Sequence, residues 1–318
     1  MPGQIQIVVP DKSGGVLDYA SCLVDSLPSA SLIRVGKESC QQWEVPQGTN
    51  VYLQMSGYGY SKRGAPLWLL GEVSKRRSRM LRLGVFFHEL YAKGKPWQSS
   101  FWVSPLQKWV VSRLASDADF WLTNREASAE WLRERAHTKG AVLLVFSNVG
   151  EIAEQVPDRE TEDVVFFGGS VVRESTYARI KDSELEKIAA TGGTIHDVGP
   201  PVSLMTADRL QRLGVRIHGP LPASEVSAIM ASVTFGVLAY RAEELEKSSI
   251  FAAYCAHGLC PVVIGESCEA ADQLKADRHY LTTLSSRSDT REIASNAWQW
   301  YQSHTLATAS SIVAERFE

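Results

Sequence analysis

A glycine pair near the N-terminus could bring backbone amides against a ligand. Gly14 and Gly15 stand between the apolar run Gln4–Val9 and a stretch of helical spacing that contains Asp18. Free N–H groups and partial positive charge gather at the N-terminus of a helix, so anions bind there. The pair lacks the third glycine of the dinucleotide fingerprint, and a plain tight turn is the alternative interpretation.

A second glycine pair follows another apolar run. Gly168 and Gly169 come directly after Val164–Phe167, and Arg173 stands four residues further along. Exposed amides beside a guanidinium, which offers a planar fork of donors, suit a diphosphate group. The alternative is a loop whose arginine forms a surface salt bridge.

Lys247, Ser248 and Ser249 precede an apolar segment with the composition of a buried helix. A serine at this point is expected to cap the helix by accepting a backbone hydrogen bond. An ammonium, two hydroxyls and free amides would then converge on one spot, which favours phosphate binding.

His88 ends the apolar run of the segment VFFHELY at Val85–Tyr91. A histidine at the carboxyl end of a strand can donate to a sugar hydroxyl or carry a proton near neutral pH. The alternative is a histidine that only caps the next turn. His88 and Asp18 are the candidate catalytic residues.

The elements that position these residues form two successive series of strands and helices. Their strands are apolar throughout, which predicts parallel sheets covered on both faces. We therefore expect an α/β protein with two doubly wound, Rossmann-like domains, residues 1–155 and 156–318, facing each other across a cleft. The polar stretch Glu151–Asp163 is the predicted linker, and Asp289–Phe317 is a predicted C-terminal helix that packs back on the first domain. The predicted strands are Gln4–Val9, Leu32–Val35, Val51–Met55, Leu83–Phe87, Phe120–Thr123, Val142–Phe146, Val164–Phe167, Thr194–Val198, Val215–His218, Phe235–Leu238 and Pro261–Ile264.

The order of these motifs resembles that of the GT-B fold glycosyltransferases, closest to the glycosyltransferase-4-like (group 1) family. The resemblance covers nearly the whole chain, from GGV-x-DY near the start to KSSIFAAYCAHGLCPVV. It implies an acceptor on the N-terminal domain, a nucleotide-sugar on the C-terminal domain, retention of configuration, and no metal or other cofactor. It also implies that Gly14 and Gly15 face the donor, that His88 contacts the transferred sugar, and that Arg173 contacts the diphosphate.

One departure from the family concerns the donor helix. The family places two glutamates seven residues apart around this helix, and the second holds the ribose. Ala253 stands at that second position, and Lys247-Ser248 replaces the usual Phe-Gly. We expect Lys247 to take over part of the donor binding.

Charge and composition limit the classes of binding partner and the cellular location that we expect. A net charge of −3 gives no general attraction to nucleic acid. No apolar run is long enough to span a bilayer, no signal peptide precedes the first strand, and the five cysteines lack metal-ligand spacing. These features predict a cytoplasmic protein with reduced thiols. A basic segment suggests peripheral contact with anionic lipid, a solvated helix face being the alternative; its cations are Lys75, Arg76, Arg77 and Arg79.

These observations predict a glycosyltransferase that moves a hexose-type sugar from a UDP- or GDP-linked donor to a hydroxyl of a glycan, glycolipid or small molecule. Two alternatives stay open: a nucleotide-sugar epimerase on the same fold, and a non-catalytic binding protein derived from a transferase.

Overall fold

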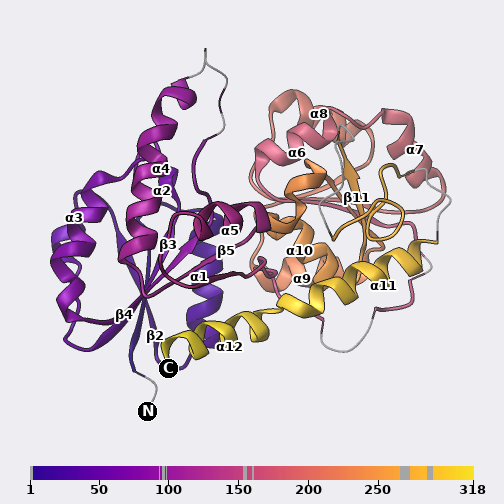
Figure 1. Cartoon of the computed structure of the whole chain (residues 1–318). Coiled ribbons are helices and arrows are strands. Elements are labelled where there is room, and N and C mark those ends of the chain that lie inside the picture. The colour runs from indigo at the N-terminus through magenta and orange to yellow at the C-terminus, as the bar shows by residue number, and fades with distance from the viewer. Residues whose placement is uncertain are drawn as a thin grey trace. The chain divides into compact units, whose positions relative to one another are not determined.

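The computed structural model describes residues 3–92, 94, 97, 99–152, 156–159, 161–265, 273–284 and 289–318. Cys268, Lys93 and Lys95 lie outside the described residues, as does part of the predicted linker. The chain divides into two compact units (Figure 1): Met1–Leu144 with Leu306–Glu318, and Val145–Thr305. The first unit thus ends before the boundary expected from the sequence, and it includes the C-terminal helix.

The first unit contains a six-stranded parallel sheet in the order β2-β1-β3-β4-β5-β6. The four inner strands are mostly buried, as the sequence predicts, whereas the edge strands β2 and β6 are largely half-buried. Their bounds are β1 (Ile5–Pro10), β2 (Ala30–Val35), β3 (Thr49–Met55), β4 (Met80–Phe87), β5 (Phe120–Thr123) and β6 (Gly140–Val142).

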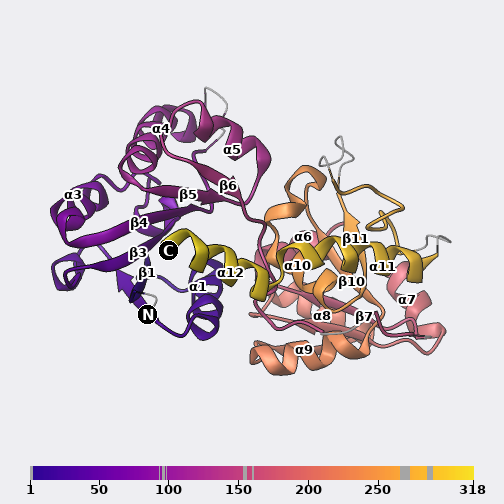
Figure 2. The same ribbon diagram turned by 60° about the horizontal axis from the view of Figure 1, so that its bottom comes forward.

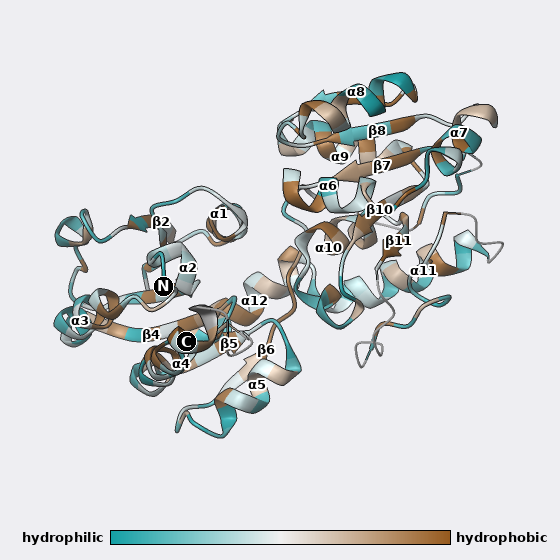
Figure 3. Ribbon diagram, turned by 90° about the horizontal axis from the view of Figure 1, so that it is seen from above, coloured by the Kyte–Doolittle hydropathy of each residue, from teal (hydrophilic) through white to brown (hydrophobic). Residues whose placement is uncertain are grey.

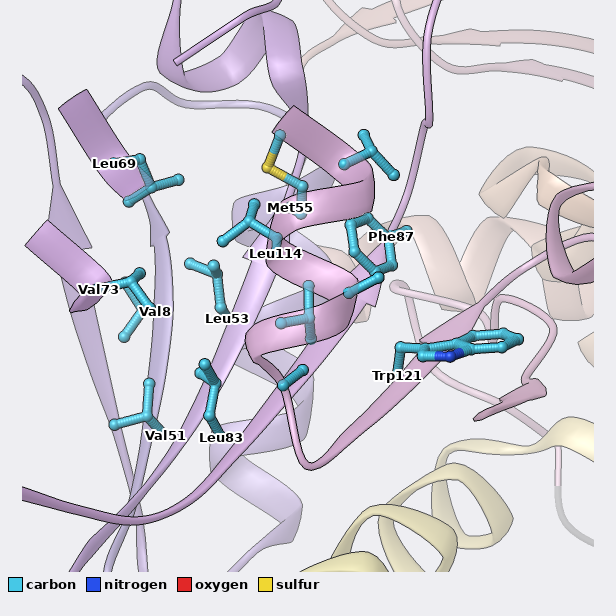
Figure 4. Close-up of a cluster of buried hydrophobic side chains, with 14 of the residues drawn as sticks. Val8, Val51, Leu53, Met55, Leu69, Val73, Leu83, Phe87, Leu114 and Trp121 are labelled. Carbon is cyan, nitrogen blue, oxygen red and sulfur yellow. The ribbon is translucent and has the colours of Figure 1, made fainter. Parts of the chain in front are cut away.

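Helices cover both faces of this sheet. Alternate side chains of the strands, such as Leu53 and Phe87, pack with Leu69 of α3 and Leu114 of α4 (Figure 4). On the other face Phe317 of α12 contacts the rings of Tyr52 and Phe120, at centroid distances of 5.9 and 5.0 Å. The helices of the unit are α1 (Gly15–Ser26), α2 (Gly57–Tyr60), α3 (Leu67–Arg76), α4 (Ser99–Asp117), α5 (Glu126–Arg133) and α12 (Leu306–Phe317), with short 3-10 turns η1 (Cys40–Gln42) and η2 (Arg77–Arg79).

The second unit contains a five-stranded parallel sheet in the order β11-β10-β7-β8-β9. In Figure 3 its inner strands are largely brown, whereas much of α8 is teal, as expected for a buried sheet under amphipathic helices. Its strands are β7 (Val164–Phe167), β8 (Ile195–Val198), β9 (Arg216–Gly219), β10 (Phe235–Ala239) and β11 (Cys260–Ile264). Its helices are α6 (Ser170–Tyr177), α7 (Asp182–Ala190), α8 (Leu204–Arg212), α9 (Ala223–Ser232), η3 (Ala242–Lys247), α10 (Ser249–Ala256), α11 (Thr290–Tyr301) and η4 (Gln302–His304).

Two predicted elements differ from the structure. The strand expected at Val142–Phe146 ends at Val142, although Leu143, Val145 and Phe146 are buried. The apolar run there reflects burial outside the sheet. The single C-terminal helix is instead two helices, because the chain leaves helical geometry at Thr305, between η4 and α12 (Figure 2).

The parallel, doubly wound sheets confirm the predicted fold class. Within the described ranges, no helix combines the length and apolar character needed to cross a bilayer. Cys22, Cys40, Cys255 and Cys260 are not in disulfide bonds.

Candidate functional site

The strand order of the second sheet places two loops at one point of its edge. β7 lies next to β10, and from this pair the chain winds outward in both directions, to β8 and β9 and to β11. Such a reversal opens a crevice at the carboxyl ends of the two strands, where α/β proteins bind ligands. The loop after β7 carries Gly168 and Gly169, and the segment after β10 carries Lys247 and Ser248.

Gly168 and Gly169 form an open turn against the first turn of α10. Gly168 has φ of +124°, a conformation that favours glycine, and its N–H donates to the carbonyl of Val198 at 3.2 Å. A Cβ on Gly168 would lie 2.3 Å from Cδ1 of Ile250, so this loop and α10 are neighbours. A Cβ on Gly169, the N-cap of α6, would meet no atom within 4 Å. The amide ends of α6 and α10 therefore lie close together, with space beside Gly169.

Ser248 is the N-cap of α10 (Ser249–Ala256), as predicted. It is buried, and its hydroxyl accepts a hydrogen bond of 3.2 Å from the N–H of Phe251. Ser249 is the half-buried first residue of α10. Lys247, also half-buried, pairs with Glu244 at 3.3 Å between Nζ and Oε2. The cation thus stands directly before the helix, held by a carboxylate in the preceding turn.

Arg173 has a different environment from the one expected for a ligand-binding arginine. Its side chain is 1% exposed and forms an ion pair with the buried Asp197. Its Nε donates to the carbonyl of Gly168 at 2.9 Å, and its Nη2 donates to the carbonyl of Pro200. Tyr177 donates to the second oxygen of Asp197 at 2.7 Å. The guanidinium therefore holds the glycine loop from beneath and does not face solvent.

Ala253, at the position where the family carries a carboxylate, lies in the core of the second unit. It is fully buried, as are most residues of α10. Its carbonyl accepts from the N–H of His257 at 3.1 Å and from that residue's Nδ1 at 2.8 Å. In this structure the position cannot supply a solvent-facing carboxylate to a ribose, so other groups would have to bind it.

The first sheet has its own reversal of strand order, between β1 and β3. Gly14, in the loop after β1, has φ of +141° and is the N-cap of α1. A Cβ on Gly14 or Gly15 would meet no atom within 4 Å. Asp18 lies exposed in the first turn of α1, and partial desolvation raises the pKa of its carboxyl. The glycines thus leave an open helix N-terminus beside an acidic group.

His88 lies just beyond β4, beside β3 and α1. Its Nε2 is 3.0 Å from Oε1 of Gln54, and its ring meets that of Tyr19 edge to face at 5.2 Å. Desolvation by burial lowers the pKa of His88 to about 3. A neutral imidazole that donates from Nε2 keeps Nδ1 as an acceptor. At neutral pH such a group can hydrogen-bond a hydroxyl, but it is a weak base.

Sequence reasoning missed the partners of His88. Gln54 is fully buried within β3, and Tyr19 is buried within α1. The signal for Gln54 was a polar side chain inside an otherwise apolar strand, because buried polar groups need partners. No comparable signal marked Tyr19.

The basic segment expected to contact lipid is largely occupied by internal pairs. Arg76 pairs with Glu72, donates to the carbonyl of Trp43 at 2.6 Å and lies over the ring of that residue. Lys75 also pairs with Glu72, and Arg77 pairs with Asp119. Carboxylates of the same unit therefore satisfy most of this cluster.

Comparison with solved structures gives a consistent picture of the fold. The chain is similar to WaaG, a glycosyltransferase involved in lipopolysaccharide biosynthesis, with a TM-score of 0.55, 14% identity and 98% coverage of each chain. It is also similar to the trehalose 6-phosphate synthase of Burkholderia multivorans, with a TM-score of 0.58 and 10% identity over 100% of this chain and 98% of that one. A glycosyltransferase from Rickettsia africae gives 0.57 and 12% identity over 99% and 97%.

The chain has the GT-B fold. Each of its two parallel sheets forms the centre of one of the two Rossmann-like domains of this fold. No protein-family model matches the sequence, and no curated protein matches it. In the described part of this GT-B chain, no group of three or more His, Cys, Asp or Glu side chains could hold a metal ion.

Proposed function

We propose that the chain is a glycosyltransferase that moves a hexose-type sugar from a nucleoside-diphosphate sugar to an acceptor hydroxyl. The observation that carries this proposal is the pair of helix N-termini at the β7–β10 reversal, one behind Gly169 and one capped by Ser248. Backbone amides at such a point bind phosphate, and the GT-B fold supplies the setting.

The diphosphate is the group that this site suits best. As the glycosidic bond breaks, negative charge grows on the leaving diphosphate, and fixed donors stabilise it. In our proposal these donors are the amides near Gly168 and Gly169, the amide and hydroxyl of Ser249, and the ammonium of Lys247. Arg173 acts through the loop that it holds. The transfer retains configuration and uses no metal, with UDP or GDP as the nucleotide.

The first unit provides the groups that meet sugar. We propose that the open turn at Gly14 and Gly15 and the neutral imidazole of His88 contact the transferred sugar or the acceptor hydroxyl. A retaining transfer needs no dedicated base; for an inverting transfer Asp18 is the better base of the two candidates, because burial leaves His88 a poor proton acceptor at neutral pH. The acceptor is a sugar or a lipid-linked sugar. Any contact of Lys75, Arg76, Arg77 and Arg79 with lipid would compete with their internal partners, and the protein would act on the cytoplasmic side.

The first test is thermal unfolding of the full chain with UDP, GDP, ADP and dTDP. A ligand that binds only the native state stabilises it by about 2.7 kcal/mol at a hundred times its Kd. We expect stabilisation by UDP or GDP and about tenfold weaker binding in Lys247→Ala, because one charged contact is lost. Lys187→Ala, an exposed lysine on α7, is the matched control and should bind as the wild type does.

The outcomes separate the alternatives. Absence of a shift with all four nucleotides would contradict the proposal and favour a non-catalytic protein. Where a nucleotide binds, its sugar conjugate is incubated with the enzyme without acceptor. Conversion of the sugar to an isomer under these conditions would identify an epimerase in place of a transferase.

A further inference from the structure

Helix α4 has its polar and aromatic residues on unexpected sides. Gln107 is 1% exposed and Ser104 is 9% exposed, whereas Trp102 and Trp109 are 73% and 55% exposed. A surface helix of a globular protein normally buries its large apolar side chains. Large exposed apolar patches rimmed by polar groups mark interaction sites.

The exposed apolar side chains share one face of the helix. Trp102, Leu106 and Trp109 follow each other at spacings of four and three residues, which places them in one row. Phe101 extends the row, since its ring lies 5.5 Å from that of Trp102. We call these four residues the α4 aromatic face.

The α4 aromatic face is held rigidly by the opposite side of the helix. Val110, Val111 and Leu114 are buried in the core of the first unit. Gln107 accepts from the N–H of Ala92 at 2.7 Å and donates to the carbonyl of Arg63 at 2.8 Å. The loop that carries Lys62 and Arg63 is therefore fixed next to α4, and the backbone of the helix that carries the aromatic face is in place before binding.

The charge around the α4 aromatic face is positive. The described residues 45–71 and 101–116 contain no aspartate or glutamate, although the whole chain carries a net charge of −3, and Asp117 at the end of α4 pairs with Arg113. Lys62, Arg63 and Lys108 are exposed. Lys108 extends over the ring of Tyr91, with 4.5 Å between Nζ and the ring centroid. Unlike most of the cluster at Lys75–Arg79, these three cations form no ion pair with any residue that the structure describes.

We propose that the α4 aromatic face is a membrane-docking surface for a bilayer that carries anionic headgroups. Tryptophan prefers the interface between hydrocarbon and water, and nearby lysine and arginine side chains are attracted to anionic lipid. A second copy of the chain is a poorer occupant, because a two-fold contact through this face would bring its cations together. This surface differs from the basic segment Lys75–Arg79 and does not depend on the proposed sugar transfer.

The test is flotation of the full chain with vesicles of phosphatidylcholine alone and of phosphatidylcholine mixed with phosphatidylglycerol. We expect binding to the mixed vesicles and at least about tenfold weaker partitioning in the double variant Trp102→Ser/Trp109→Ser, because binding scales with the apolar area that enters the interface. The matched control is Leu204→Ser/Met205→Ser, which removes two side chains of the second unit that are 85% and 81% exposed. It should float as the wild type does.

Thermal unfolding checks that both double variants remain folded, as expected for substitutions of exposed side chains. Failure of the wild type to float with the mixed vesicles would overturn the proposal, and so would equal flotation of the tryptophan variant. Light scattering tests whether a second copy of the chain binds to the α4 aromatic face instead of a membrane. A dimer that dissociates in the tryptophan variant, without vesicle binding by the wild type, would assign the face to a second copy.

Discussion

The glycine pairs after β1 and β7 have the same sequence pattern but different surroundings. Gly14 and Gly168 both have positive φ, and each stands at the start of a helix. Around Gly14 and Gly15 the space is open, whereas a Cβ on Gly168 would clash with Ile250, and the carbonyl of Gly168 accepts a hydrogen bond from Arg173. The half of the first loop before Gly14 is held by Arg34, which donates to the carbonyl of Asp11, and the second loop is held by a buried ion pair. The comparison shows that a glycine turn becomes rigid through the residues packed beneath it.

Removal of the arginine beneath the second loop gives the largest expected effect. Arg173→Ala leaves the buried Asp197 without its cation, and breaking such a pair costs about 3–5 kcal/mol. Urea unfolding followed by circular dichroism measures this loss. The matched control is Arg179→Ala. This exposed arginine follows α6, and its removal should change stability by less than about 0.5 kcal/mol. A loss below about 1 kcal/mol in Arg173→Ala would show that the ion pair does not hold the loop.

Alanine substitutions at the loop glycines test how much the packing around each loop contributes to stability. Gly168→Ala and Gly14→Ala both force a side chain into a positive-φ conformation, at a cost of about 1–3 kcal/mol each. We expect the larger loss in Gly168→Ala, because its Cβ also meets Ile250, and partial recovery when Ile250→Val is added. Gly15→Ala, which has neither constraint, serves as control in the same urea experiment. Equal losses of stability in Gly14→Ala and Gly168→Ala would show that contact with Ile250 adds nothing to the cost at Gly168.

The smallest expected effect concerns pH and the first unit. His88 has a pKa near 3 in the native state and near 6.5 when unfolded, so between these values the unfolded state binds more protons. Its contribution to stability is therefore complete above pH 6.5 and is lost as the pH falls toward 3. Between pH 7 and pH 6 the loss is about 0.7 kcal/mol at most.

The variant His88→Gln isolates this contribution. It should flatten the dependence of the unfolding free energy on pH, whereas His137→Gln, an exposed histidine, should not. Some dependence will remain in both variants, because burial also lowers the pKa of His304 to about 3. An unchanged pH profile in His88→Gln would mean that the imidazole is solvated enough to titrate normally.

Much of the fold could be predicted from the sequence, because parallel strands buried on both faces are written as continuous apolar runs. Val164–Phe167 and Phe120–Thr123 were predicted with the bounds that the structure shows. The error at Val142–Phe146 has the same physical origin. Burial makes a segment apolar whether or not it hydrogen-bonds into a sheet.

The candidate site was predictable only in part. The serine cap of α10 follows from local chemistry, and Ser248 fills that position. The environment of Arg173, in α6, depends on Asp197 in β8, and no local pattern links a helical residue to a residue on another element. The same holds for His88 and Gln54.

The two parallel sheets, the glycine turns and the helix cap follow from the order of residues alone, since they depend on the backbone preferences and hydropathy of consecutive residues. Tertiary structure alone decided which charged groups remain available for a ligand. Arg173 and Arg76 form ion pairs with the buried carboxylates of Asp197 and Glu72, whereas Lys108 is exposed on the surface. The physical reason is that pairing and desolvation depend on neighbours brought together by folding, and these neighbours are distant in the chain.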